Sequence, residues 1–155
     1  MLFRSKESME LLGEIKLAAP GGLATDKTGK LFAVSGQSVV TIVDGKVAPL
    51  VTSHLDKPTG LAIDAQGKIY VADRGTHQVK VFAAAGAFDH AVGAAGGRPL
   101  PGKWLPGGMR DPSGIAIDPQ GRLWVAEETM YPKRFSVWAA DGSLVTDFID
   151  RKSTR

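Results

Sequence analysis

Short apolar runs alternate with turns rich in glycine and aspartate along most of the chain. Between residues 58 and 92 there are four such runs, at residues 60–64, 68–73, 78–82 and 88–92. The run at 78–82 (Gln-Val-Lys-Val-Phe) alternates polar and apolar side chains, as a half-buried strand does. Four short antiparallel strands within a few tens of residues are typical of one blade of a β-propeller.

The same pattern occurs three times, starting at Pro20, Pro58 and Pro112. Each copy continues with a glycine, an apolar run that ends in aspartate, a turn that contains glycine, and a second apolar run. Self-similarity at such a spacing predicts a repeat architecture. The expected fold is therefore all-β: a β-propeller of four-stranded antiparallel blades, with three full blades and an N-terminal partial blade, that is, an incomplete or half propeller.

The repeats divide residues 1–155, read as a single partial propeller, into segments. Blades are expected over 20–52, 58–92 and 112–149, an inserted loop over 93–111 and a tail over 150–155. Residues 1–19 are interpreted as the remnant of a preceding blade. Within them, a strand at 2–4 followed by a strand over 9–17 competes with a short helix over 6–12, and periodicity does not decide between the two.

One aromatic position recurs in the three copies, as Phe32, Tyr70 and Trp124. An aromatic side chain at an equivalent position of every blade is expected to pack between neighbouring blades. These three residues are therefore predicted to belong to the core and not to a ligand site.

Composition and charge are those of an ordinary globular domain, with 43% apolar and 23% charged residues. The net charge of +3 is equalled by Arg151, Lys152 and Arg155, so the folded body is expected to be close to neutral. This argues against a nucleic-acid partner, which selects a clustered basic face. There is no cysteine for a disulfide, no apolar run long enough for a membrane span, and no signal-peptide run at the start.

The repeated pattern resembles the NHL repeat, Pro-x-Gly-[Ile/Leu]-Ala-[Val/Ile]-Asp followed by a turn and an aliphatic-aromatic-Val-Ala-Asp strand. The match is closest over Pro58 to Phe82, with Asp73 and His77 in place. The third copy departs from it, because Glu127 replaces the aspartate and residues 129–134 replace the usual turn. The resemblance implies a propeller domain of the kind found in bacterial secreted or cell-envelope proteins.

The resemblance also implies a partner. NHL propellers close with about six blades, and three blades in an arc leave two apolar blade faces exposed. We therefore expect either that the chain is part of a longer protein or that it associates with a second copy of itself to close the ring.

The irregular loops are expected to share one face of the propeller. The connections between the first and second strands carry the uniform turns, whereas residues 74–77, 93–110 and 127–134 lie in connections to the other face. Loops on a rigid scaffold commonly carry binding residues. The predicted binding surface contains Arg74, His77, Trp104, Met109, Arg110, Glu127, Glu128, Tyr131, Lys133 and Arg134.

Several of these residues have two interpretations. Trp104 either plugs the neighbouring groove as a lid on the core or anchors a partner. Glu127 and Glu128 either hold Ca²⁺ or another divalent cation near the axis, or one of them pairs with Lys133 or Arg134, which the spacing favours. Asp73 and His77 are expected to form hydrogen bonds within their own turn.

Three functions follow. The first is a non-catalytic module that binds a protein or small ligand through the irregular loops, without a cofactor. The second, implied by the resemblance, is a metal-dependent lactonase- or lyase-like enzyme with Glu127, Glu128, Tyr131 and His77 as candidates. The third is RNA binding. Its candidate cations are Arg74, Lys103, Arg110, Lys133 and Arg134, with Asp73, Asp111, Glu127 and Glu128 interspersed among them.

Overall fold

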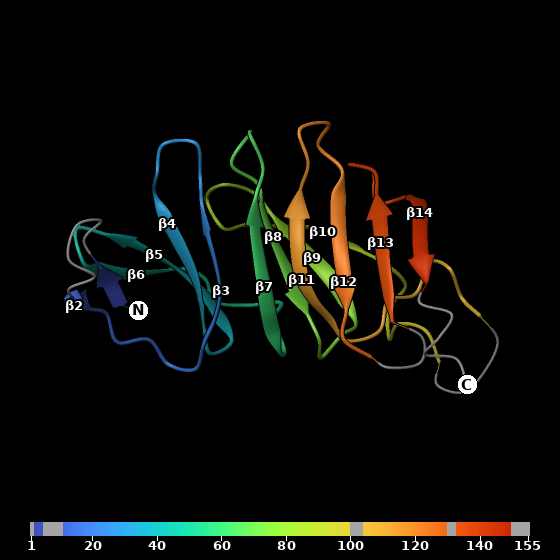
Figure 1. The fold of residues 1–155 in the computed structure, drawn as a ribbon, viewed down its shortest axis with the longest axis horizontal. Coiled ribbons are helices and arrows are strands. Elements are labelled where there is room, and N and C mark those ends of the chain that lie inside the picture. Colours follow the sequence, from blue (N-terminus) through green and yellow to red (C-terminus); the bar gives the residue numbers. More distant parts are fainter. Residues whose placement is uncertain (1, 5–10, 100–103, 130–132, 150–155) are drawn as a thin grey trace.

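Three antiparallel four-stranded sheets follow one another along an arc, with a two-stranded ribbon at one end (Figure 1). This computed structural model describes residues 2–4, 11–99, 104–129 and 133–149. Within these ranges the regular secondary structure consists of β-strands alone. The sheets are blade 1 (β3-β4-β5-β6), blade 2 (β7-β8-β9-β10) and blade 3 (β11-β12-β13-β14). The predicted all-β fold, a partial β-propeller, is confirmed.

Each blade consists of four consecutive strands. Blade 1 contains β3 (Pro20–Thr25), β4 (Leu31–Ser35), β5 (Ser38–Val43) and β6 (Lys46–Val51). Blade 2 contains β7 (Pro58–Ile63), β8 (Ile69–Asp73), β9 (Gln78–Phe82) and β10 (Phe88–Val92). Blade 3 contains β11 (Pro112–Ile117), β12 (Leu123–Glu127), β13 (Arg134–Trp138) and β14 (Leu144–Ile149).

The ribbon pairs β1 (Leu2–Arg4) with β2 (Leu11–Glu14). Residues 11 and 12 are therefore extended, as the strand interpretation of this segment predicts and the helix interpretation does not. The remainder of the alternative helix, residues 6–10, lies outside the described residues.

An aspartate organises the first turn of every blade. Asp64 Oδ1 accepts hydrogen bonds from the backbone N–H groups of Gln66 (2.9 Å) and Lys68 (2.8 Å). Asp26 and Asp118 accept the equivalent bonds in the other two blades. This is the local side-chain bonding that makes aspartate a strong turn residue. The repeated aspartate is therefore structural.

The aromatic at the recurrent position reaches the same aspartate where it has a polar group. The Tyr70 hydroxyl donates to Asp64 Oδ2 (3.3 Å), and Trp124 Nε1 donates to Asp118 Oδ2 (3.0 Å). Burial, together with the negative charge of Asp64, raises the pKa of Tyr70 to about 12. Partial burial of the Asp118 carboxyl is outweighed by the bonds from Trp124 and Arg122, which lower its pKa to about 2.

Apolar side chains fill the space between neighbouring blades. One core, between blades 1 and 2, includes Phe32 and Phe82, and a second, between blades 2 and 3, includes Tyr70 and Trp138. The prediction of a core position is thus correct for Phe32 and Tyr70. It is wrong for Trp124, which is partly exposed, because the described residues place no further blade against its side of blade 3.

Glycines let the innermost strands approach one another. A Cβ atom on Gly22 would lie 2.8 Å from the carbonyl oxygen of Thr59, and one on Gly60 would lie 1.9 Å from that of Ser113. The glycines of the first two repeats therefore pack against the backbone of the repeat that follows, which explains why the pattern requires glycine there. A hydrogen bond from Thr59 Oγ1 to the carbonyl of Pro112 (3.0 Å) joins β7 to β11.

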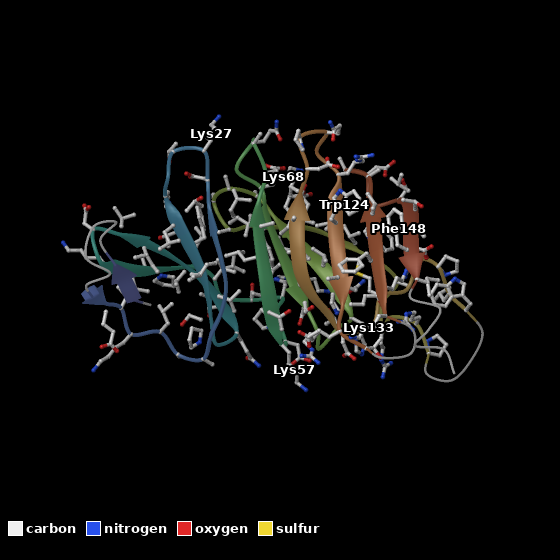
Figure 2. All side chains as sticks on the ribbon, viewed as in Figure 1. Lys27, Lys57, Lys68, Trp124, Lys133 and Phe148 are labelled. Carbon is white, nitrogen blue, oxygen red and sulfur yellow. The ribbon has the colours of Figure 1, made fainter. Side chains whose placement is uncertain are left out.

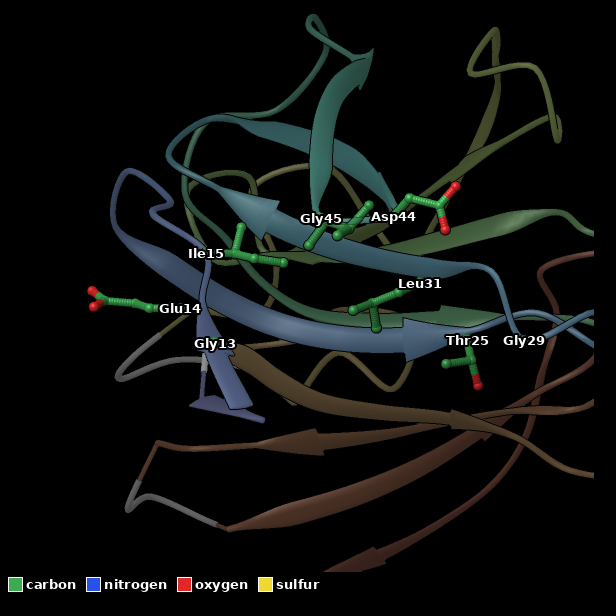
Figure 3. Close-up of a pocket in the computed structure, with 9 residues that line it drawn as sticks. Gly13, Glu14, Ile15, Thr25, Gly29, Leu31, Asp44 and Gly45 are labelled. Carbon is green, nitrogen blue, oxygen red and sulfur yellow. The ribbon is translucent and has the colours of Figure 1, made fainter. Parts of the chain in front are cut away.

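A cleft of about 620 Å³ separates the ribbon from blade 1 (Figure 3). Ile15 and Leu17, which follow β2, pack on the blade beside Ala33, Val40 and Ile42. The cleft is mainly apolar and lies at the end of the arc far from blade 3. In the described ranges, no helix has the length and apolar character needed to cross a membrane.

Candidate functional site

The uniform turns and the irregular loops lie on opposite sides of the arc. Figure 2 shows Lys27 and Lys68, from the uniform turns, on one side, and Lys57 and Lys133, from the other connections, on the opposite side. We call this second side the loop face: it carries Lys57 and residues 74–77, 93–99, 104–111, 128–129 and 133. Hydrogen bonds join the described parts of these segments to one another.

The insertion folds back on itself along two backbone hydrogen bonds. The N–H of Ala94 donates to the carbonyl of Gly107 (2.7 Å), and that of Arg98 donates to the carbonyl of Met109 (3.0 Å). Glycines permit this close return, since a Cβ on Gly108 would lie 2.7 Å from the backbone nitrogen of Arg98. These bonds hold residues 94–98 beside residues 107–109 and place Arg98 inside the protein.

A buried carboxylate, Glu127 at the end of β12, binds this insertion to blade 3. Its Oε2 accepts hydrogen bonds from Arg98 Nε (3.1 Å) and the backbone N–H of Arg110 (2.8 Å), while its Oε1 lies 3.3 Å from Arg134 Nη1. The side chains of Glu127 and Arg134 are fully buried and that of Arg98 almost so. Burial raises the pKa of Glu127, and the facing guanidinium groups of Arg134 and Arg98 oppose that rise.

Arg134, the first residue of β13, connects the rest of this group. Its Nη1 donates to the carbonyl of Gly108 (2.8 Å), its Nη2 to that of Pro106 (2.6 Å), and its Nε to Asp147 Oδ2 on β14 (3.0 Å). We name Arg98, Glu127, Arg134 and Asp147 the ion cluster. It has two guanidinium groups and two carboxylates, so its charges balance, as buried charges must.

Trp104 lies over the ion cluster. The guanidinium carbons of Arg98 and Arg134 are 5.4 and 5.3 Å from the centroid of its ring, within the range of cation–π attraction. The side chain remains 40% exposed, and the adjacent Leu105 is also exposed. Trp104 therefore covers two arginines and does not plug an apolar groove. The exposed indole ring is held in position by its contacts with these two guanidinium groups.

Three of the predicted binding residues are not available at the surface. Met109 is fully buried in the core between blades 2 and 3, so its prediction as a surface contact is wrong. Its side chain turns inward because the insertion reverses direction just before it. Glu127 and Arg134 are buried in the ion cluster.

The other predicted binding residues differ in how far they are exposed to solvent. Arg74, His77 and Arg110 are partly buried, and Glu128 and Lys133 are exposed. Tyr131 lies outside the described residues, as does Lys103.

His77 joins blade 2 to the start of blade 3. Its Nδ1 accepts a hydrogen bond from the backbone N–H of Asp111 (3.1 Å), so this nitrogen carries no proton. The bond reaches the start of the next blade, whereas a bond within the turn of His77 was expected. Burial, with the nearby charge of Arg110, lowers the pKa of His77. Both His77 (φ 56°) and Asp111 (φ 48°) adopt left-handed backbone conformations, which this contact helps to hold.

Asp73 does bond within its turn, as predicted. Its carboxylate accepts from the N–H of Gly75 (3.2 Å) and the Thr76 hydroxyl (3.0 Å), and also from the N–H of Lys57 (2.8 Å). A cleft of about 460 Å³ opens beside this turn, lined by Lys57, Pro58, Thr59, Arg74, Gly75, His77 and Asp111.

The two glutamates considered as metal ligands, Glu127 and Glu128, are bound to cations of the protein. Glu128 pairs with Arg74 (2.9 Å) and Glu127 with Arg98 and Arg134, so the pairing that the spacing favours for Glu127 is present. Within the described ranges, no three His, Cys, Asp or Glu side chains gather as metal ligands would. Two of the cations considered for RNA, Arg74 and Arg134, face carboxylates in the same way.

Arg98 and Asp147 are the site residues that the sequence patterns do not reveal. An arginine between glycines and prolines is typical of an exposed loop, and the partner of Arg98 lies 29 positions away. A usable signal is the departure of the third repeat, where Glu127 replaces the usual aspartate and Arg134 begins the next strand.

Comparison with known proteins supports the same class, a partial propeller. The family model of the NHL repeat matches residues 55–82, so the chain contains an NHL repeat where the resemblance was closest. No curated protein sequence matches the chain significantly.

Solved propeller structures resemble the chain in fold. A nidogen/laminin complex superposes with a TM-score of 0.69 at 19% identity over 96% of this chain and 56% of that one. A virginiamycin B lyase from Staphylococcus aureus, with quinupristin, superposes with a TM-score of 0.64 at 17% identity, over 86% of this chain and 42% of the lyase. A gluconolactonase from Xanthomonas campestris superposes with a TM-score of 0.63 at 20% identity, over 83% of this chain and 46% of the gluconolactonase. The chain thus spans about half the length of these structures, and identities this low show the fold alone.

Proposed function

We propose that this chain is a non-catalytic binding module that recognises a protein partner through its loop face. The observation that carries the proposal is Trp104, 40% exposed and held against two buried guanidinium groups. Tryptophan is among the residues that contribute most to protein–protein affinity. An aromatic already fixed before binding loses little conformational entropy in the complex, which favours affinity.

The surroundings of Trp104 suit a protein surface better than an enclosed small ligand. Leu105 is exposed next to it, and the exposed Arg74–Glu128 pair supplies polar groups on the same face. An apolar centre with a polar rim is the usual anatomy of a protein interface. Protein complexes also occur in this fold class, as the nidogen/laminin structure illustrates for its own components.

The test compares Trp104→Ala with Phe88→Ala, a control of similar exposure (41%) on an outer strand of blade 2. Partners captured from cells of the source organism are identified and their affinities measured with each variant. Trp104→Ala is expected to weaken binding at least about tenfold, with a loss of stability of only about 1–2 kcal/mol from the two cation–π contacts. Phe88→Ala should bind normally. Equal binding by the Trp104 variant and wild type would refute the proposal.

A further inference from the structure

The outer face of blade 3 repeats a surface that is buried elsewhere in the chain. Phe135 occupies in β13 the position that Val79 occupies in β9, and Phe148 pairs with it as Val92 pairs with Val79. Val79 and Val92 are buried between blades 2 and 3, whereas Phe135 and Phe148 are 56% and 54% exposed. Trp124 stacks on Phe148 beside them, with ring centroids 6.2 Å apart (Figure 2). We call Gly114, Trp124, Phe135 and Phe148 the blade-3 face.

The glycine of the third repeat lacks the contact that the other two make. A Cβ on Gly22 or Gly60 would strike the backbone of the following repeat, but one on Gly114 would meet only the Cβ of Ala126, at 3.6 Å. The space against Gly114 thus has the shape that accepts the innermost strand of another blade. A shallow apolar groove of about 420 Å³ runs alongside it, lined by Gly114, Ile115, Ala116, Trp124, Val125, Ala126 and Phe135.

The opposite end of the arc carries the complementary half of the same contact. Leu23 in β3 is 46% exposed, while its equivalent in β7, Leu61, is buried in the core between blades 1 and 2. Ile15 and Leu17 cover part of this end, beside the cleft next to the ribbon, and leave Leu23 exposed. β3 therefore presents outward the side that β7 presents to blade 1 and β11 presents to blade 2.

From these matching halves we propose that the blade-3 face binds the blade 1 end of a second copy of this chain. β3 of one copy lies against β11 of the other, as β7 lies against β3 and β11 against β7 within one chain. The contact is head to tail, so it buries different surfaces on the two copies and occurs twice in a pair that closes into a ring. It involves the sheet face and not the loop face, which stays accessible.

The test measures the mass of the chain in solution by size-exclusion chromatography with light scattering. The wild type is expected at twice the 16.4 kDa of one chain. The double variant Phe135→Glu/Phe148→Glu and the single variant Leu23→Glu should each weaken self-association at least about thirtyfold and elute as monomers. Leu105→Glu, which adds the same charge at an exposed residue of the loop face, should leave the dimer intact. Circular dichroism verifies that every variant is folded.

Mixing the two monomeric variants distinguishes the geometry. In a head-to-tail pair, the intact blade 1 end of the double variant meets the intact blade-3 face of the Leu23 variant, so the mixture should recover a heterodimer. A symmetric contact between two blade-3 faces would leave the Leu23 variant dimeric and would overturn the proposal, as would two monomeric variants that do not combine. So would a wild type that remains monomeric at high concentration, which would assign the face to another polypeptide, or a dimer that the substitutions do not affect.

Discussion

Glu127→Gln is the substitution that most directly probes the ion cluster. Glutamine has nearly the same shape as glutamate and keeps a carbonyl that accepts the Arg110 N–H bond. It removes the negative charge that faces two guanidinium groups inside the protein, at 3.1 Å from Arg98 and 3.3 Å from Arg134. The change therefore isolates the charge of Glu127 from its packing.

The expected loss of stability is large. Removing one partner of a buried, hydrogen-bonded ion pair costs about 3–5 kcal/mol, because the remaining charge stays buried without compensation. Asp147 still faces Arg134 after the substitution, which favours the lower half of that range. For a chain of this length each kcal/mol lowers the melting temperature by about 2–4 °C, so a loss of about 3–4 kcal/mol should lower it by about 6–16 °C.

The adjacent residue provides the control. Glu128 carries the same charge, but its pair with Arg74 is exposed on both sides, and such pairs contribute about 0–1 kcal/mol. Glu128→Gln should therefore lower the melting temperature by less than about 4 °C. Both variants are compared with wild type by circular dichroism and by limited proteolysis of the insertion, which should accelerate only for Glu127→Gln. Indistinguishable melting temperatures for the two variants would refute the assignment of Glu127 as the anchor of the insertion.

Three further predictions concern the scaffold. Gly60→Ala should lower the free energy of unfolding, measured with urea on the dilute protein, by about 1–3 kcal/mol or more, because its Cβ would strike a backbone carbonyl. Gly114→Ala should change this free energy by less than about 0.5 kcal/mol. Equal losses for the two variants would contradict the contact between blades. Because the pKa of His77 is lowered in the folded state, the stability that it contributes is present above its unfolded pKa and is lost as the pH falls through the folded value. His77→Gln should flatten stability between about pH 7 and pH 5, and an NMR pKa at or above the ordinary histidine value would contradict this. The raised pKa of Tyr70, about 12, means that stability falls as the pH rises from about 10 to 12; ultraviolet titration should show a late component that Tyr70→Phe removes, and ionisation of that component at the ordinary tyrosine pKa would exclude the predicted environment.

The blades could be predicted because the physics that forms them is local. Asp64 and its equivalents close their turns with hydrogen bonds to residues two and four positions away, so the sequence around each turn contains all the partners. The strands between turns follow from alternation and β-branched residues. The partial exposure of Trp124 could not be predicted in this way, because it depends on what lies against blade 3 and not on the repeat itself.

The candidate site depends on contacts that no local pattern records. Arg98 is buried because the insertion returns at Gly107 and Gly108 and delivers it to Glu127, on another blade segment. The same reversal turns Met109 inward. Trp104 is an unusual residue for a loop in the sequence alone, but its support by two guanidinium groups depends on that long-range folding.

The contact of Gly22 and Gly60 with the backbone of the next repeat has a consequence for how such chains diversify. The contact is between backbone atoms, so the pitch of the arc is independent of the side chains that fill the space between blades. Those side chains are then free to vary in size from one gap to the next: the same position holds Phe32 between blades 1 and 2 and Tyr70 between blades 2 and 3. One glycine in the innermost strand thus keeps the spacing between neighbouring blades constant, while the side chains of the core between them can change.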